Sequence, residues 1–361
     1  MSIGREKQLG GTVPPKRILY VGELTYGGTC RQRMEALLKL GHNITPVDVK
    51  APASRVELLA SRIAFKLFRL GVPFLSPFDH AHANAQIKKQ IEGNEFDILW
   101  IDKALMISPT AIRAFKRTFK QAKIIAYSPD DMCGRHNQSH RFLSSLPLID
   151  LYVTTKSHNV SELGDLGCKR VYLIDKSFDP DTHFPVVIEA DERRKVGGPV
   201  GFIGGYERER ANSINYLARN GVPVTVYSNS WPKAETPVPG LRINHFAMEG
   251  DDYRKGINAF DIGLCFLRKL NRDQQTARSI EIPACGVFML AERTEEHLRL
   301  FEEGTEAEFF SSNEELLEKA RFYCDNPEIR IRVAKRGLER CYRDGYSHLH
   351  RLDQILQQIY S

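Results

Sequence analysis

The sequence predicts an α/β protein that consists of two doubly wound units, and three observations carry this prediction. Short runs of aliphatic, β-branched and aromatic residues alternate with segments of helical periodicity, which is the pattern of parallel sheets covered by helices. The stretch 176–199 interrupts this alternation with three prolines, two glycines and a cluster of charges, as a linker does. Each half begins with a strand, a turn that contains two adjacent glycines, and the start of a helix.

The first half begins with the strand RILYVG at 17–22. The helix that follows, at 30–41, ends at Gly41, and glycine is the residue that most readily stops a helix. Further strands are predicted at 43–49, 96–102, 122–128, 149–155 and 169–175, with a helix at 109–120. This order of elements predicts one parallel sheet.

The second half repeats the pattern. Strands are predicted at 200–205, 222–228, 241–246, 259–267, 286–291 and 307–310. Helices are predicted at 209–221, 294–303, 313–325, 327–342 and 346–360. We therefore expect a first domain at 1–180, a linker at 181–199, a second domain at 200–345 and a last helix at 346–361.

The composition is that of a globular protein and not of a disordered or fibrous one, since 42% of the 361 residues are hydrophobic and 27% are charged. The seven cysteines form no C-x-x-C pair, and several lie in apolar runs, so buried thiols and a reducing compartment are expected. The start MSIGREKQLGG is polar, and no run approaches the roughly 20 apolar residues of a membrane span. We expect a cytoplasmic protein.

Charge is divided unevenly along the chain, with a net +9 over residues 1–180 and −3 over residues 181–361. Part of the excess lies in the run 55–70, which places aliphatic residues at helical spacing together with basic ones. These are Val56, Leu59, Ile63, Leu67 and Leu70, with Arg55, Arg62, Lys66 and Arg69. Such a helix either packs on its own domain or lies on an anionic membrane surface, here the inner face. The second alternative suits a partner that is anionic or lipid-linked.

The glycine turn of the second half is a candidate anion site. It reads FIGGYERER and contains Gly204, Gly205, Tyr206 and Arg210. Adjacent glycines let backbone amides approach a ligand, and the helix start and Arg210 add positive charge, which suits a phosphate or a diphosphate. The pattern is neither G-x-G-x-x-G nor a P-loop. The alternative is an ordinary strand-to-helix turn.

A second constellation lies in TARSIEIPACGVFML at 276–290. Arg278 and Glu281 stand three residues apart, and Asp273 lies eight residues before Glu281. A carboxylate in this place can bind both hydroxyls of a ribose, and an arginine can pair with a diphosphate. The alternative is a simple Arg–Glu ion pair on one face of a helix.

Polar residues of the first half gather where parallel strands end. Asp130 and Asp131 lie in the turn SPDD after the strand 122–128, where they can act as a base or bind sugar hydroxyls, although aspartate is also common in turns. The neighbouring strand ends bring further candidates to the same edge: Glu23, Gly27, Gly28, Asp102 and Lys103. No metal site is predicted, because His80 and His82 lack metal-ligand spacing to any later cluster.

Taken together, these segments resemble the spore-maturation CgeB-like group of glycosyltransferases, which have the GT-B fold. The resemblance covers roughly residues 95–358 and is carried by FIGGYERER, VTVYSNSW, INAFDIGLCFL and TARSIEIPACGVFMLAE, with IIAYSPDDMCGRHNQSHRF upstream. It implies two Rossmann-like domains that face each other across a cleft, with a last helix that crosses back to the first domain.

The resemblance also implies which domain binds the donor. The second domain would bind a nucleotide-sugar, such as a UDP-, GDP- or dTDP-sugar, without a cofactor or metal ion. Glu281 matches the carboxylate that holds the donor ribose, and Arg278 and Arg210 match basic positions near the diphosphate. Asp273 stands where related retaining enzymes have a glutamate that contacts the sugar.

We therefore expect a metal-independent, hexosyltransferase-like enzyme that moves a sugar to a hydroxyl acceptor, such as a cell-surface or lipid-linked glycan in polysaccharide biosynthesis. If the reaction inverts configuration, Asp130 or Asp131 is the expected base, with Glu23 second. Three alternatives stay open: a nucleotide-sugar epimerase, a DNA-modifying glucosyltransferase, and a non-catalytic nucleotide-sugar-binding protein. A nucleic-acid acceptor is not expected, because the sequence shows no groove-reading helix or set of stacking aromatic residues.

Overall fold

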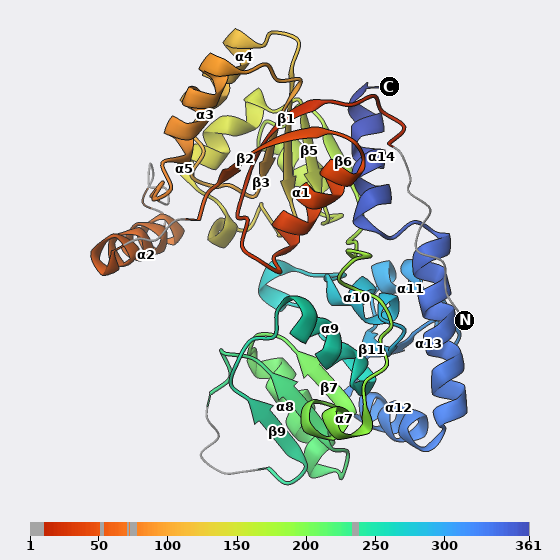
Figure 1. Ribbon diagram of the computed structural model, residues 1–361. Helices are drawn as coiled ribbons and strands as arrows, with labels where there is room; N and C mark the ends of the chain where they lie inside the picture. Colours follow the sequence, from red (N-terminus) through yellow and green to blue (C-terminus); the bar gives the residue numbers. More distant parts are fainter. Residues whose placement is uncertain (1–10, 51–53, 71, 73–77, 233–237, 361) are drawn as a thin grey trace. The chain divides into compact units, whose positions relative to one another are not determined.

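The computed structural model describes residues 11–50, 54–70, 72, 78–232 and 238–360 (Figure 1). The chain divides into two compact units. Unit 1 consists of Met1–Asp175 with His348–Ser361, and unit 2 is Lys176–Ser347. Each unit contains one sheet of six strands that all run parallel, with helices on both faces.

The sheet of unit 1 has the order β2-β1-β3-β4-β5-β6. Its strands are β1 (Arg17–Gly22), β2 (Asn43–Asp48), β3 (Ile98–Asp102), β4 (Lys123–Ser128), β5 (Leu151–Thr154) and β6 (Val171–Leu173). Its helices are α1 (Thr29–Lys39), α2 (Arg55–Arg69), α3 (Ala83–Gly93), α4 (Pro109–Thr118), α5 (His140–Ser145), α6 (Asn159–Asp165) and α14 (His348–Tyr360). Short 3₁₀ turns, η1 (Arg135–Asn137) and η2 (Leu146–Leu148), flank α5.

Alternation along β1 shows why this sequence forms a central strand. Leu19 and Val21 belong to the core cluster shared with α3 and α4, whereas Ile18 and Tyr20 belong to the cluster shared with α1 and α14. All four side chains are buried, as expected for a strand that is covered on both faces. The last helix, α14, therefore completes the core of unit 1 although it ends the chain.

Unit 2 has the equivalent order β12-β11-β10-β7-β8-β9. Its strands are β7 (Gly198–Ile203), β8 (Val224–Tyr227), β9 (Leu241–Asn244), β10 (Phe260–Cys265), β11 (Phe288–Glu292) and β12 (Glu308–Phe310). Its helices are α7 (Ala190–Val196), α8 (Arg208–Arg219), α9 (Gly250–Asn258), α10 (Arg278–Ala284), α11 (Glu295–Leu300), α12 (Asn313–Asp325) and α13 (Pro327–Arg343), and η3 (Lys269–Asn271) precedes α10.

Both sheets reverse their direction of growth at one place. In unit 1 the chain passes from β2 at the edge back to β3, on the other side of β1, and in unit 2 it passes from β9 back to β10, beside β7. Ligands of doubly wound sheets bind at such switch points, beyond the carboxyl ends of the strands. The two switch points lie where the sequence predicted the candidate residues of each half.

The predicted α/β class is confirmed, and each predicted strand is present. Ten of the twelve strands are one to four residues shorter than expected. The segment predicted as a linker differs from the expectation, because it contains α7 and belongs to unit 2. Arg193 on α7 pairs with Asp261 at 2.6 Å, and the amide of Val186 donates to the side chain of Asn258. Prolines and charges made this segment resemble a linker, but its charged residues form ion pairs with the unit. None of the helices in the described ranges is long and apolar enough to span a membrane.

A buried ion pair stabilises the centre of unit 1. Arg33 on α1 donates from Nε and Nη2 to the two carboxylate oxygens of Asp102, at 2.7 and 2.9 Å. The Tyr20 hydroxyl donates to the same carboxylate at 2.6 Å. Both charged side chains are about 95% buried or more. Asp102 therefore joins α1 to the end of β3. The sequence had suggested that it faces an acceptor, but its carboxylate is engaged by Arg33 and Tyr20.

We predict that Asp102→Asn destabilises unit 1 by about 3–5 kcal/mol, because it leaves the guanidinium of Arg33 buried without its counter-charge. Hydrogen exchange followed by mass spectrometry measures this as faster exchange of β1 and β3, with the strands of unit 2 as an internal reference. Glu35→Gln is the matched control, since it breaks the exposed α1 pair with Arg31 and should cost less than about 1 kcal/mol. Equal protection in the two variants would contradict the prediction.

Candidate functional site

The glycine turn after β7 has a defined geometry. Gly204 lies against the ring of Phe202, which an added Cβ would approach to 2.7 Å, so no larger residue fits without movement. The Trp231 indole donates to the carbonyl of Gly204 at 3.1 Å, and the amide of Tyr206 donates to Ser230 Oγ at 2.9 Å. These two hydrogen bonds fix the course of the turn.

Two arginines meet beside this turn. Arg210, on the first turn of α8, is 5% exposed and donates to the carbonyl of Gly205 at 3.1 Å. Arg278 is the first residue of α10, and both guanidinium groups lie over the ring of Phe202, at 5.9 and 5.5 Å from its centroid. Burial, and then the charge of Arg278, lower the pKa of Arg210. Two like charges held together in this way favour an anion between them.

Unused hydrogen-bonding capacity points to the same ligand chemistry. The Nε atoms of Arg210 and Arg278 are buried, and neither has a hydrogen-bond partner within the part of the chain that is described. Buried donors normally have partners, and a bound group that accepts hydrogen bonds from both would satisfy them. The turn, the two arginines and the N-terminus of the 12-residue helix α8 together match a phosphate or diphosphate group.

Glu281 lies one turn further along α10 and is 5% exposed. Its alternative ion pair with Arg278 is not present among the described residues. Instead the hydroxyl of Tyr253, on α9, donates to its Oε2, and Nε2 of His183 lies 3.7 Å from its Oε1. Burial and the charge of Glu281 raise the pKa of Tyr253 well above its usual value, so the hydroxyl stays a donor.

Sequence reasoning missed both partners of Glu281. His183 lies in the segment that was expected to be a linker, and Tyr253 lies on a helix that was not predicted. Nδ1 of His183 accepts from the amide of Asp179 at 3.1 Å, which places the ring proton on Nε2, toward Glu281. The Asp-Pro-Asp turn at 179–181 thus positions this histidine. No motif in the sequence marks this arrangement.

Asp273 follows η3 and binds its own loop. Its Oδ1 accepts from the side chain of Asn271 at 2.7 Å, and its Oδ2 accepts from the amide of Arg268 at 3.3 Å. Glu292, at the end of β11, fastens the start of the same loop by accepting from the amide of Leu267 at 3.0 Å. The loop between β10 and α10 therefore has a fixed course beside the two arginines.

At the edge of unit 1, Asp130 forms an ion pair with Lys103. Lys103 directly follows β3 and has a φ of +49°, a conformation that residues with a Cβ rarely adopt and that is common at functional sites. Glu23 is more exposed and binds Lys50 and Thr25, each at 3.0 Å. Burial raises the pKa of Glu23, but these hydrogen bonds outweigh it, and the net shift is downward. Gly27, with a φ of +72°, and Gly28, the N-cap of α1, complete the neighbouring turn.

Asp131 differs from its neighbour because it is 1% exposed. Its Oδ1 accepts from the amides of Cys133 and Gly134 and from the side chain of Asn159, at 3.1, 3.2 and 2.8 Å. The ligand atoms of Asp131, Cys133 and Glu162 lie within 4.8 Å of one another, and Asn159 also donates to Glu162. Hydrogen bonds to the turn and to α6 therefore account for this cluster.

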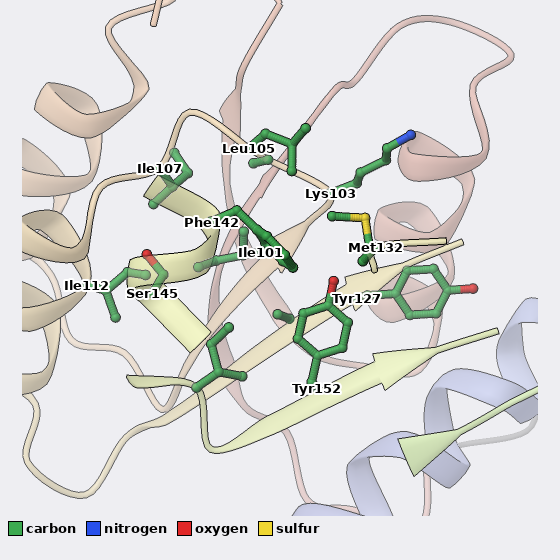
Figure 2. A pocket seen from close by; sticks show the side chains of 13 residues that line it. Ile101, Lys103, Leu105, Ile107, Ile112, Tyr127, Met132, Phe142, Ser145 and Tyr152 are labelled. Carbon is green, nitrogen blue, oxygen red and sulfur yellow. The ribbon is translucent and has the colours of Figure 1, made fainter. Parts of the chain in front are cut away.

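A small cavity lies under this edge (Figure 2). Figure 2 shows that its lining is mostly apolar, with Ile101, Phe142 and Met132 around it, and that the amino end of Lys103 points away from them. Its volume of about 30 Å³ has room for about one water molecule. The cavity, which Lys103 helps to line, is thus too small to accommodate a substrate.

Residues 208–357 match a family model described as glycosyl transferase-like. No curated protein sequence matches the chain. Among solved structures, the chain is similar to Anabaena HepE in complex with UDP-glucose, with 12% identity over 96% of this chain and 99% of that chain and a TM-score of 0.62.

Two further structures are similar over comparable lengths. One is an alpha-glucosyltransferase in complex with UDP and a 13-mer DNA that contains an HMU base, with 12% identity over 96% of this chain and 100% of that chain and a TM-score of 0.66. The other is sucrose-phosphate synthase from Thermosynechococcus elongatus, with 12% identity over 96% and 99% and a TM-score of 0.62.

At this level of identity the structural likeness establishes the fold, which is GT-B, as the sequence predicted. The family match lies almost entirely over unit 2, where the glycine turn, both arginines and Glu281 are found. The chain therefore contains a glycosyl transferase-like domain at residues 208–357.

Proposed function

We propose that this enzyme transfers a sugar from a nucleotide-sugar to a hydroxyl group, without a metal ion. The observation that carries the proposal is the pair Arg210 and Arg278, whose buried Nε atoms lack partners among the described residues beside a glycine turn. A nucleoside diphosphate is the leaving group of such a reaction, and these groups neutralise the charge that develops on it. UDP-sugars are the first donors to test, because HepE and the alpha-glucosyltransferase bind UDP or UDP-glucose; GDP- and dTDP-sugars follow.

Glu281 is proposed to bind the ribose of the donor. Tyr253 and His183 hold its carboxylate in place, and a carboxylate has further lone pairs with which to accept hydrogen bonds from ribose hydroxyls. Both carboxylate oxygens of Asp273 accept hydrogen bonds within its own loop. Its proposed contact with the sugar therefore requires the loop to change conformation. The resemblance to the CgeB-like group remains part of this proposal.

The acceptor is proposed to bind at the switch point of unit 1. Asp130 is the preferred base and Glu23 the second, whereas Asp131 is occupied by backbone and amide donors and is buried. Lys103 lowers the cost of keeping Asp130 charged and can release it when an acceptor hydroxyl binds. If the reaction retains configuration, these groups position the acceptor and no base is needed.

A second candidate acceptor is a nucleic acid. The net charge of +9 over residues 1–180 favours an anionic partner, and one similar structure contains DNA. DNA binding that falls steeply between 50 and about 200 mM salt would favour this acceptor, whereas no binding at the lower salt concentration would remove it. Release of a rearranged nucleotide-sugar in the absence of any acceptor would instead favour an epimerase.

We predict that Arg210→Ala and Arg278→Ala each weaken UDP binding by roughly 10–100-fold, because each removes charge-assisted hydrogen bonds to the diphosphate. Isothermal titration calorimetry measures the effect. Arg219→Ala is the matched control, since Arg219 is exposed at the far end of the same helix α8. Wild-type affinity in both site variants would exclude the proposed diphosphate site.

The ribose assignment gives a separate prediction. Glu281→Gln should weaken binding of UDP by roughly tenfold but should leave binding of 2′,3′-dideoxy-UDP nearly unchanged, because only UDP offers the hydroxyls that the carboxylate accepts from. Calorimetry with both nucleotides measures the difference, and the thermal unfolding midpoint verifies that the variant is folded. An equal loss for the two nucleotides would show that Glu281 acts through the structure of α10.

We also predict that dialysis against EDTA does not change the rate at which the enzyme forms UDP from a UDP-sugar, because arginines and backbone amides supply the positive charge. Coupled detection of UDP measures the rate. A loss of activity that Mg²⁺ or Mn²⁺ restores would contradict the metal-independent mechanism, while leaving the diphosphate site intact.

A further inference from the structure

Helix α2 presents an apolar stripe that the described residues of unit 1 do not cover. The stripe consists of residues whose side chains are 41–75% exposed, namely Val56, Leu59, Ile63, Leu67 and Leu70. Their spacing of three and four residues places them on one face of the helix. Of the two alternatives for this stripe, the exposure of its side chains disfavours packing on its own domain.

The opposite side of α2 fixes the helix to unit 1. Phe68 is 3% exposed, and Arg135 of η1 donates to its carbonyl at 3.0 Å, with the guanidinium 4.5 Å from the ring centroid. A capping box of Ser54 and Glu57 defines where the helix begins. Figure 1 shows α2 extending from the edge of unit 1. The exposure of the stripe thus follows from the way the helix is anchored.

Basic residues run along the side of the stripe. Arg55, Arg62 and Lys66 are exposed and follow the same helical spacing, so they form a basic row next to the stripe. The acidic Glu57 is engaged by the amide of Ser54 at the helix start. An apolar stripe with a basic row beside it is the arrangement by which a helix lies in the interface of an anionic membrane.

We infer that α2 docks the protein on an anionic lipid surface, with the apolar stripe at the acyl boundary and the basic row at the headgroup phosphates. The charge of the row selects this occupant over a neutral apolar partner, because a buried protein interface would desolvate the three cations without supplying counter-charges. Val72 and Phe78, which follow α2 in the chain, are also exposed, at 42% and 46%.

The docking surface is linked to the acceptor edge. Arg135, which holds Phe68, lies five residues after Asp130 in the same turn after β4. A membrane that binds α2 therefore lies near the residues proposed to bind the acceptor, and it selects a lipid-linked hydroxyl acceptor over a soluble one. This last step rests on the proposed function, whereas the docking itself does not.

Vesicle flotation with the full chain tests the docking. Wild type is expected to bind vesicles of phosphatidylcholine with 30 mol% phosphatidylglycerol at least about tenfold more strongly than pure phosphatidylcholine vesicles. The stripe variant Leu59→Gln/Ile63→Gln/Leu67→Gln should lose at least about tenfold in affinity. The row variant Arg62→Glu/Lys66→Glu should lose a similar factor and its dependence on salt.

Matched controls make the result specific to α2. Lys88→Glu/Lys89→Glu reverses two exposed lysines on α3 of the same unit, and Val187→Gln replaces an aliphatic residue that is 92% exposed in unit 2. Both controls should bind vesicles like wild type. Wild type that does not float with anionic vesicles, or stripe and row variants that bind as wild type does, would overturn the inference.

Two further outcomes separate the alternatives. In one outcome, wild type does not bind vesicles, and light scattering shows a concentration-dependent dimer that the stripe variant does not form. This outcome would assign the stripe to a second copy of the chain and would overturn the inferred membrane docking. UDP affinity is measured on the same samples without vesicles. A variant that no longer binds vesicles but binds UDP like wild type has lost only the function of α2. Wild type that does not bind UDP would instead contradict the proposed function.

Discussion

Within each of the two sheets all strands run parallel, and the arrangement of the candidate site depends on this polarity. Parallel pairing sends all carboxyl ends of a sheet to one edge, so residues that are distant in sequence meet there. Glu23 and Lys103 follow neighbouring strands in unit 1, and Gly204 and the loop before Arg278 follow neighbouring strands in unit 2. The reversal of strand order at these places opens the space that a ligand can occupy.

In unit 2, the arrangement of the candidate site has an electrostatic cost. Arg210 and Arg278 repel each other in a partly dry environment, and their Nε atoms remain without partners among the described residues. Glu281, by contrast, is already oriented by a hydroxyl and an imidazole. In the proposed donor site, Glu281 is the hydrogen-bond acceptor for a neutral sugar, and the two arginines are the partners of an anion. A nucleoside diphosphate offers both groups in one molecule.

The sequence was sufficient for features that depend on local patterns. Short apolar runs located the strands, Gly41 marked the end of α1 within two residues, and the two glycine turns were placed at the ends of β1 and β7. It was insufficient wherever a side chain had more than one partner within reach. Asp102 was expected at an open edge, but Arg33 and Tyr20 take up its charge. The spacing of Arg278 and Glu281 suggested an ion pair, yet His183 and Tyr253 come from segments whose contacts no local pattern reveals. The direction in which α2 turns its stripe likewise depends on the contact between Phe68 and Arg135.

The two tryptophans of the chain lie in different units. Trp231 donates to the carbonyl of Gly204 and packs edge-on against Tyr206, beside the glycine turn, whereas Trp100 is fully buried in β3 between Tyr20 and Tyr127. Indole emission responds to changes in its polar surroundings, so a ligand that binds at the turn would alter the fluorescence of Trp231 and leave that of Trp100 constant. The protein thus carries an intrinsic optical probe of the proposed donor site, together with an internal reference in the other unit.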